Sequence, residues 1–147
     1  MTTPPRKTYD TPPLPGEVWM EGELEDVILD THAKATDGRI RARFGDLYED
    51  GQGTPHRLKL YVGWMLGFTH ENPDTERAVN EINVKQLNEL FLALGVKDEP
   101  DYKALPDFVG QRVRVRVGRW VKKGMYWVPQ GLKFEAVDAV DDAPLPF

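Results

Sequence analysis

The chain of 147 residues contains no cysteine. Disulfide bonds and thiolate chemistry are therefore excluded, and a cytoplasmic location is the default expectation. Its three histidines, His32, His56 and His70, stand far apart, and none has the spacing of a helical metal-binding pair. No glycine-rich loop of the kind that cradles phosphate is present. We therefore expect no enzyme activity, no cofactor and no metal site.

Long apolar runs are also missing. The longest, over residues 60–68, has nine residues, whereas a membrane-spanning helix needs about 20. Residues 1–16 lack the apolar segment of a signal peptide and hold five of the twelve prolines, which predicts a flexible or polyproline-like arm. The length predicts one ordered domain over 17–137, followed by a tail over 138–147. No membrane partner is expected.

Short alternating segments dominate the rest of the chain. Apolar and polar residues alternate, as in strands, over residues 17–29, 39–48, 56–62, 111–120 and 125–137. Between the third and fourth of these, the apolar residues of 72–95 recur at helical spacing, after an Asn-Pro pair typical of a helix start. This order predicts a mainly β fold, namely a five-stranded OB-like barrel with one helix between strands 3 and 4.

Positive charge is segregated, although the net charge is −5. Alternation places Arg or Lys on one face of each of three strands, and apolar residues on the other face. The outward positions are Arg39, Arg41 and Arg43, then Arg57, Lys59 and Tyr61, then Arg112, Arg114 and Arg116. Residues 110–134 contain seven basic residues and no acidic one, whereas 135–147 contain four acidic residues and no basic one.

Two interpretations of the basic faces remain open. Like charges on neighbouring strands repel, so a polyanion or nearby acids must compensate them. Glu21, Glu23 and Glu25 of the first strand are candidates to pair with Arg39 to Arg43 of the second. The fourth strand has no comparable acidic neighbour in sequence, so we expect its arginines to be available to a polyanion.

Aromatic residues lie near the basic ones. We expect Tyr61, Trp64, Trp120 and Tyr126 to be exposed, whereas Phe44, Phe91, Phe108 and Phe134 are expected in the core. For Trp19 and Trp127, the sequence does not decide between a core and a surface position. Basic side chains that follow a phosphate backbone, with rings that stack bases, are typical of proteins that bind single strands without reading sequence.

The last residues, "DDAPLPF", complete this pattern. Together with the expected barrel order and the "PLPGEVW" and "DFVGQRVRVRV" segments, they resemble the single-stranded DNA-binding proteins of bacteria and, most of all, the compact ones of phages. The long glycine-rich linker of bacterial members is absent. The resemblance implies that Asp141, Asp142, Pro146 and Phe147 dock into basic, apolar-lined pockets of replication and repair enzymes. It also implies host cytoplasm if a phage encodes the chain.

The sequence therefore predicts a protein that binds and protects single-stranded DNA, without strong sequence preference, during replication, recombination and repair. The expected DNA-binding residues are Arg41, Arg43, Arg57, Lys59, Tyr61, Trp64, Arg112, Arg114, Arg116, Arg119, Trp120, Lys122, Lys123 and Tyr126. A homo-oligomer is compatible with the sequence. The acidic tail is expected to fold back over the basic face when no DNA is bound.

Two other classes of function stay open. One is a protein-interaction module, such as an adaptor or host-takeover protein, whose basic sheet binds an acidic partner. The other is a metal-dependent nuclease. Its candidate ligands are Glu21, Glu23, Glu25 and Asp26, or Asp46 and Glu49 near Lys59.

Overall fold

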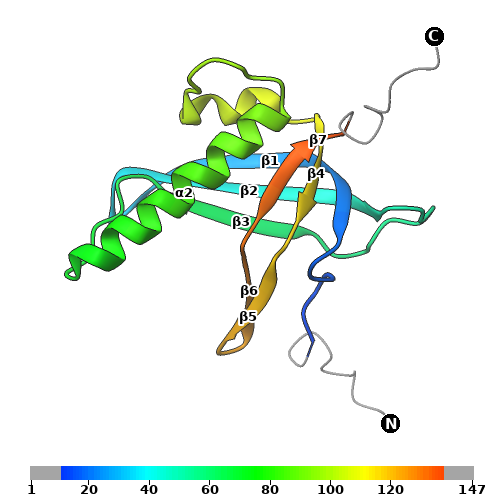
Figure 1. The fold of residues 1–147 in the computed structure, drawn as a ribbon, viewed down its shortest axis with the longest axis horizontal. Coiled ribbons are helices and arrows are strands. Elements are labelled where there is room, and N and C mark those ends of the chain that lie inside the picture. The colour runs from blue at the N-terminus through cyan, green and yellow to red at the C-terminus, as the bar shows by residue number, and fades with distance from the viewer. Residues whose placement is uncertain (1–10, 138–147) are drawn as a thin grey trace.

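The computed structural model describes residues 11–137, and over this range the protein is mainly β (Figure 1). The strands are β1 (Trp19–His32), β2 (Ala35–Glu49), β3 (Leu60–Met65), β4 (Arg112–Arg116), β5 (Arg119–Lys123), β6 (Tyr126–Gln130) and β7 (Lys133–Ala136). One α-helix, α2 (Pro73–Ala93), and a 3-10 helix, η1 (Tyr102–Phe108), lie between β3 and β4. The prediction of a mainly β fold is therefore confirmed.

Five strands form one antiparallel sheet in the order β3-β2-β1-β4-β7. The central strand β1 pairs with β2 along most of its length and with β4 near its start. Strands β3 and β7 are the two edges, so the described residues form no closed barrel. Figure 1 shows α2 crossing the sheet and the β5–β6 hairpin projecting away from it.

The last two expected strands each break into two. Strand 111–120 divides into β4 and β5, and strand 125–137 divides into β6 and β7. The breaks face each other, because the Gly118 amide donates to the Gly131 carbonyl at 3.2 Å. Gly131 has a φ of 66°, which favours glycine, and this explains why regular pairing stops there. Beyond the glycine pair, β5 and β6 continue as a separate two-stranded ribbon.

The core lies between the sheet and α2. The expected alternation is confirmed in β2, where Ile40, Ala42 and Phe44 are buried. Phe44 contacts Phe134 of β7, with ring centroids 5.7 Å apart. The helix contributes Leu87, Leu90 and Phe91 to the same cluster, and Phe108 packs partly buried against it. Leu14, within the segment expected to be a flexible arm, is also buried in this cluster.

Polar residues recur along the side of α2 that faces the sheet, and each forms a hydrogen bond to the sheet or to the loop that follows β3. The pairs are Asn80 with both backbone groups of Phe68, Asn83 with the Met65 carbonyl, Gln86 with the Trp64 indole, and Glu89 with the Phe134 amide. The helix begins as expected, because the Asn72 side chain accepts from the backbone amides of Asp74 and Thr75. Its position over the sheet is thus fixed by directional contacts as well as by apolar packing.

The close approach at the glycine pair is open to a direct test. A Cβ atom on Gly118 would lie 3.0 Å from the Gly131 carbonyl oxygen and 3.2 Å from that of Gln130. We expect Gly118→Ala to lower the free energy of unfolding by about 1–3 kcal/mol, because backbone atoms cannot move aside without distorting the junction. Gly53→Ala is the matched control, since a Cβ there meets nothing within 4 Å. Urea denaturation measures both, and equal stability of the two variants would contradict the expected crowding.

Candidate nucleic-acid interface

The basic face of β2 is neutralised within the sheet. Arg39 and Arg41 both contact Asp30 of β1, at 3.0 and 2.8 Å. Arg43 contacts Glu25 at 3.1 Å, and Lys59 contacts the same carboxylate at 2.8 Å. The interpretation of cross-strand ion pairing is therefore confirmed for this strand. Of the three predicted acids only Glu25 takes part, and Asp30 takes the place expected for Glu21 and Glu23.

Arg112 and Arg114 of β4 are also paired, so the expectation that the arginines of this strand are available to a polyanion is wrong for these two. Arg112 contacts Glu21 of β1 at 2.7 Å. Arg114 contacts Asp50 at 2.6 Å and Glu135 of β7 at 2.8 Å, and its side chain is 8% exposed. These acids come from strands beside β4 and from the segment after β2, which are distant in sequence. Arg114 is consequently a structural residue with little surface to offer a ligand.

Trp64 is buried, so the expectation that it is an exposed stacking residue is wrong. Its exposed fraction is 1%, and its indole Nε1 donates to Gln86 Oε1 at 2.9 Å. The reason is strand parity, because residues three apart on a strand face opposite sides. Tyr61 faces outward and is 64% exposed, so Trp64 points into the core. The strand also begins at Leu60, so Arg57 lies before it, exposed and without an ion pair among the described residues.

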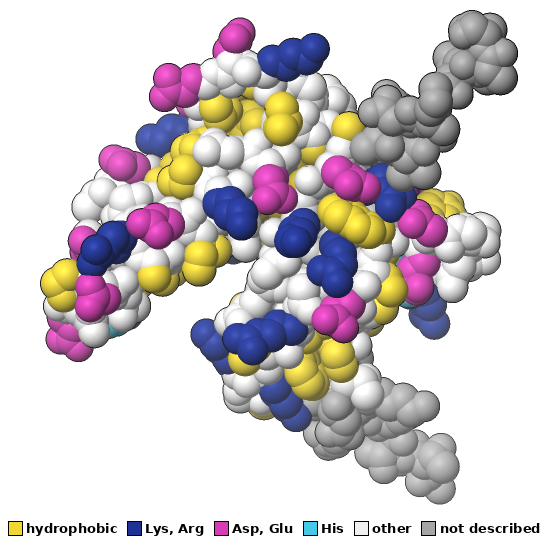
Figure 2. Space-filling model, viewed as in Figure 1, with side chains coloured by type: hydrophobic (Ala, Val, Ile, Leu, Met, Phe, Trp, Pro, Cys, Tyr) yellow, Lys and Arg dark blue, Asp and Glu magenta, His cyan; other side chains and the backbone are white. Residues whose placement is uncertain are grey.

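Five basic residues without an acidic partner lie close together, on the β5–β6 hairpin and on the strands next to it. Within residues 11–137, no ion pair is formed by Arg116, Arg119, Lys122, Lys123 or Lys133. We call Arg119, Lys122 and Lys123, all on β5, the hairpin cluster. Arg116 and Lys133 lie opposite each other where β4 and β7 approach the hairpin. Figure 2 shows Lys and Arg side chains over the hairpin and the strands beside it.

Aromatic side chains accompany the hairpin cluster. Tyr126, at the start of β6, is 76% exposed. Lys122 Nζ lies 5.8 Å from the centroid of the Trp127 ring, and these two residues are opposite each other in the ribbon. Trp120 is half-buried and packs against the core, so its expected exposure is not found. The indole N–H groups of Trp120 and Trp127 are buried and have no acceptor among the described residues.

A groove of about 850 Å³ lies between the edge strand β3, the first half of α2 and strand β6. A smaller depression of about 420 Å³ covers the outward face of β2 and β3. Both are lined by Tyr61, Val62, Gly63 and Met65, so they adjoin along β3. Arg119 of the hairpin cluster lines the larger groove. A continuous path therefore runs from the sheet face, past Tyr61, to the hairpin.

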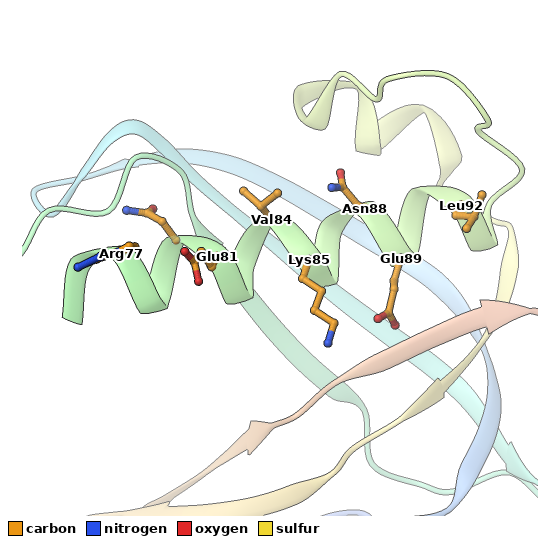
Figure 3. A pocket seen from close by; sticks show the side chains of 8 residues that line it. Arg77, Glu81, Val84, Lys85, Asn88, Glu89 and Leu92 are labelled. Carbon is orange, nitrogen blue, oxygen red and sulfur yellow. The ribbon is translucent and has the colours of Figure 1, made fainter. Parts of the chain in front are cut away.

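Another depression, of about 810 Å³, runs along α2 (Figure 3). It is lined by residues of this helix alone, and its charged side chains alternate in sign: Arg77, Glu81, Lys85 and Glu89. In Figure 3, Lys85 and Glu89 point toward the strands, whereas Val84 and Asn88 point toward the other side of the helix. It lacks the concentration of one charge sign that distinguishes the hairpin.

Four of the six carboxylates considered as metal ligands are bound to, or lie near, a basic side chain. Glu21 and Glu25 form the ion pairs described above, Asp46 lies 3.8 Å from Arg112, and Glu49 is bound to His56 at 2.8 Å. Among residues 11–137, no group of three or more His, Asp or Glu side chains is arranged to hold a metal ion. The same part of the chain contains no helix long and apolar enough to span a membrane.

The predicted partner-binding residues Asp141, Asp142, Pro146 and Phe147 lie outside the described residues. No protein-family model matches the sequence, and no curated protein matches it either.

The ion pairs predict how stability depends on pH. Hydrogen bonds from Lys59, Arg39 and Arg114 hold the pKa values of Glu25, Asp30 and Asp50, respectively, below their ordinary values. A carboxyl pKa that is lower in the folded state adds stability above the unfolded-state pKa, and this stability is lost as pH falls through the folded value. We therefore expect the free energy of unfolding to be level from about pH 7 to 5 and to fall below about pH 4.5.

One variant isolates a single pair. We expect Asp50→Asn to cost up to about 1 kcal/mol at pH 7, because Asp50 is largely exposed, and to weaken the fall in acid. The control Asp98→Asn changes an exposed residue that forms no ion pair among the described residues, and we expect it to alter neither property. Urea denaturation at several pH values measures both, and an unchanged acid slope in Asp50→Asn would contradict the role of this pair.

Proposed function

We propose that this protein binds single-stranded DNA with little sequence preference and protects it during replication, recombination and repair. The observation that carries the proposal is the hairpin cluster, which has no acidic partner among the described residues although the chain has a net charge of −5. Exposed Tyr126 and Tyr61 and the groove along β3 lie beside this charge. Phosphates and bases together are the ligand that such a surface fits best.

The structure changes which residues are assigned to the phosphates. Arg116, Arg119, Lys122 and Lys123 carry unpaired charge, and they are proposed to meet the backbone. Arg41, Arg43, Lys59, Arg112 and Arg114 are bound to carboxylates, so a phosphate would have to displace an acid from each of them. They are proposed mainly to hold the sheet together. Tyr61 and Tyr126 remain the proposed stacking residues, and each stacked base contributes about 1–3 kcal/mol.

The fold proposed for this function is an open variant of the OB barrel. It rests on three features: the β1-β2-β3 meander, the pairing of β1 with both β2 and β4, and the position of α2 between β3 and β4. OB folds bind nucleic acid on the face of their second and third strands and with the loops that flank it. The outward face of β2 and β3 and the β5–β6 hairpin occupy the corresponding places.

A protein-interaction module is the second candidate, because an acidic protein surface also complements the hairpin cluster. In such a module, the exposed tyrosines and the groove would have no role as surfaces for stacking bases. The two candidate functions are distinguished by measuring, through tryptophan fluorescence, whether the purified protein prefers a single strand to its duplex form. Lys122 over the Trp127 ring makes that indole sensitive to a phosphate that binds the lysine.

The hairpin cluster predicts the salt dependence of binding. Four or five phosphate contacts give a log–log slope of about −3, since each contact on a single strand contributes about −0.7. We expect Lys122→Ala/Lys123→Ala to weaken binding to oligothymidine more than tenfold at low salt and to reduce the slope by about 1.4. The matched control is Lys97→Ala/Lys103→Ala, which removes equal charge from two exposed lysines away from the hairpin.

Fluorescence or filter-binding titrations at several salt concentrations measure both double variants. Equal affinities in the two variants would show that the effect is one of net charge alone and would overturn the assignment to the hairpin. A slope near zero in the unmodified protein would overturn the phosphate contacts altogether.

The tail is proposed to recruit replication and repair enzymes and to compete with DNA for the basic surface. Residues 138–147 contain Asp138, Asp141 and Asp142 and no basic residue. We expect deletion of 138–147 to tighten binding to oligothymidine at low salt and to leave it nearly unchanged at high salt, where charges are screened. Replacement of the three aspartates by asparagine in the full chain is the control for length. Affinity that is unaffected by either change would exclude competition by the tail.

A further inference from the structure

Two amide side chains of α2 line the groove beside β3 and have unused hydrogen-bonding groups. They are Asn83 and Gln86, one turn apart on the helix. Residues at this spacing are neighbours on a helix surface, with Cβ atoms about 5–6 Å apart. Asn80, the preceding residue of the same series, has both ends of its amide bound to the loop that follows β3. Asn83 and Gln86 differ from Asn80, because each uses only one end of its side-chain amide.

The orientation of both amides is fixed by their partners. The Trp64 indole Nε1 can only donate, so Gln86 must present its oxygen to it and leave its NH₂ group free. The Met65 carbonyl can only accept, so Asn83 must present its NH₂ group and leave its oxygen free. Neither free group has a hydrogen-bond partner within residues 11–137. The groove therefore contains one donor and one acceptor, side by side and in defined positions.

The other walls of the groove are largely apolar. Val62 and Met65 of β3 lie on one side, and Val128, Pro129 and Leu132 lie on the other. A ligand that fits must have apolar faces and a polar edge that carries both a donor and an acceptor. Arg119, which also lines the groove and has no acidic partner in the described chain, adds a site for an anion.

A nucleobase attached to a phosphate backbone has this combination of properties. Every DNA base carries an amino or imino N–H donor next to an oxygen or ring-nitrogen acceptor on its Watson–Crick edge, and proteins that extrude bases read this edge between apolar walls. We propose that the groove is a base-binding subsite, in which Gln86 donates to the base, Asn83 accepts from it, and Arg119 meets the adjoining phosphate. The inference rests on the proposed binding of single-stranded DNA and names the part of that site which holds a base.

The subsite recognises the presence of a base and not its identity. All four bases provide the donor–acceptor pair, so hydrogen bonding here agrees with weak sequence preference. A peptide segment is the competing occupant of such a groove. The adjoining hairpin cluster favours the nucleic acid, because it supplies the positive charge that a phosphate backbone needs.

The protein-side test is Gln86→Glu. Glutamate keeps an oxygen acceptor for the Trp64 indole but replaces the free donor with a second acceptor. We expect affinity for oligothymidine to fall about tenfold, because the hydrogen bond from Gln86 is lost and a carboxylate acceptor then faces an acceptor of the base. The matched control is Asn88→Asp, which makes the same amide-to-carboxylate change on another side of α2 and keeps the acceptor for the Tyr102 hydroxyl. We expect Asn88→Asp to change affinity less than about twofold, as for an exposed charge.

The ligand-side test uses the unmodified full-length protein, so it does not depend on how a variant folds. Oligothymidine is compared with an oligomer of the same length in which difluorotoluene, a thymine shape mimic without hydrogen-bonding groups, replaces every base. We expect the natural oligomer to bind about tenfold more tightly, the value of two modest hydrogen bonds, and Gln86→Glu to reduce this difference because it removes one of them.

Each outcome addresses one proposal. If the unmodified protein binds no oligonucleotide at low salt, the proposed function is wrong and the subsite falls with it. If it binds both oligomers equally, or if Gln86→Glu and Asn88→Asp behave alike, single-strand binding stands and the subsite is wrong. The latter result is also the one expected if the groove takes a peptide.

Discussion

The pairing of β1 with an arginine-rich strand on each side is the interaction on which the rest of the structure depends. β2 contributes Arg39, Arg41 and Arg43, and β4 contributes Arg112 and Arg114. Placed side by side without acids, such strands repel. On β1, Asp30 and Glu25 form ion pairs with the arginines of β2, and Glu21 forms one with Arg112 of β4. Arg114 is paired instead with Asp50 and Glu135. The sheet is therefore an assembly of complementary charge on its outward face, above an apolar inner face.

The pairing of arginines with acidic residues ends at the first residue of β1. The last pair between β1 and β4 is Trp19 with Arg116, and no acidic residue faces that arginine across the strands. Beyond it, β5 and β6 pair only with each other, so Arg119, Lys122 and Lys123 have no acidic strand beside them. The unpaired positive charge of residues 110–134 thus lies on the hairpin and at the adjoining ends of β4 and β7. For this reason a protein of net negative charge has a basic arm, and composition alone does not show where that arm lies.

The sequence was sufficient for the features that depend on local pattern. Alternation identified the buried faces of β2 and β4, and helical spacing and the Asn72 cap located α2. The error at Trp64 was avoidable, since strand parity from Tyr61 already placed it inward. The partners of Arg112 and Arg114 were not predictable in this way, because Glu21 and Asp50 are 91 and 64 residues from them in sequence. Neither the free amide ends of Asn83 and Gln86 nor the groove has any sequence signal, because both arise from packing of the helix on β3.

The break at Gly118 and Gly131 links the charge to the groove. The five-stranded sheet ends at the Gly118–Gly131 contact, and the β5–β6 ribbon continues beyond it with its unpaired cations. Both glycines, with Arg119 of β5 and residues 127–130 of β6, also line the groove beside the edge strand β3. The break in the ladder therefore lies where the basic hairpin and the groove meet, and these are the two elements on which the proposed binding of a charged, base-bearing strand rests.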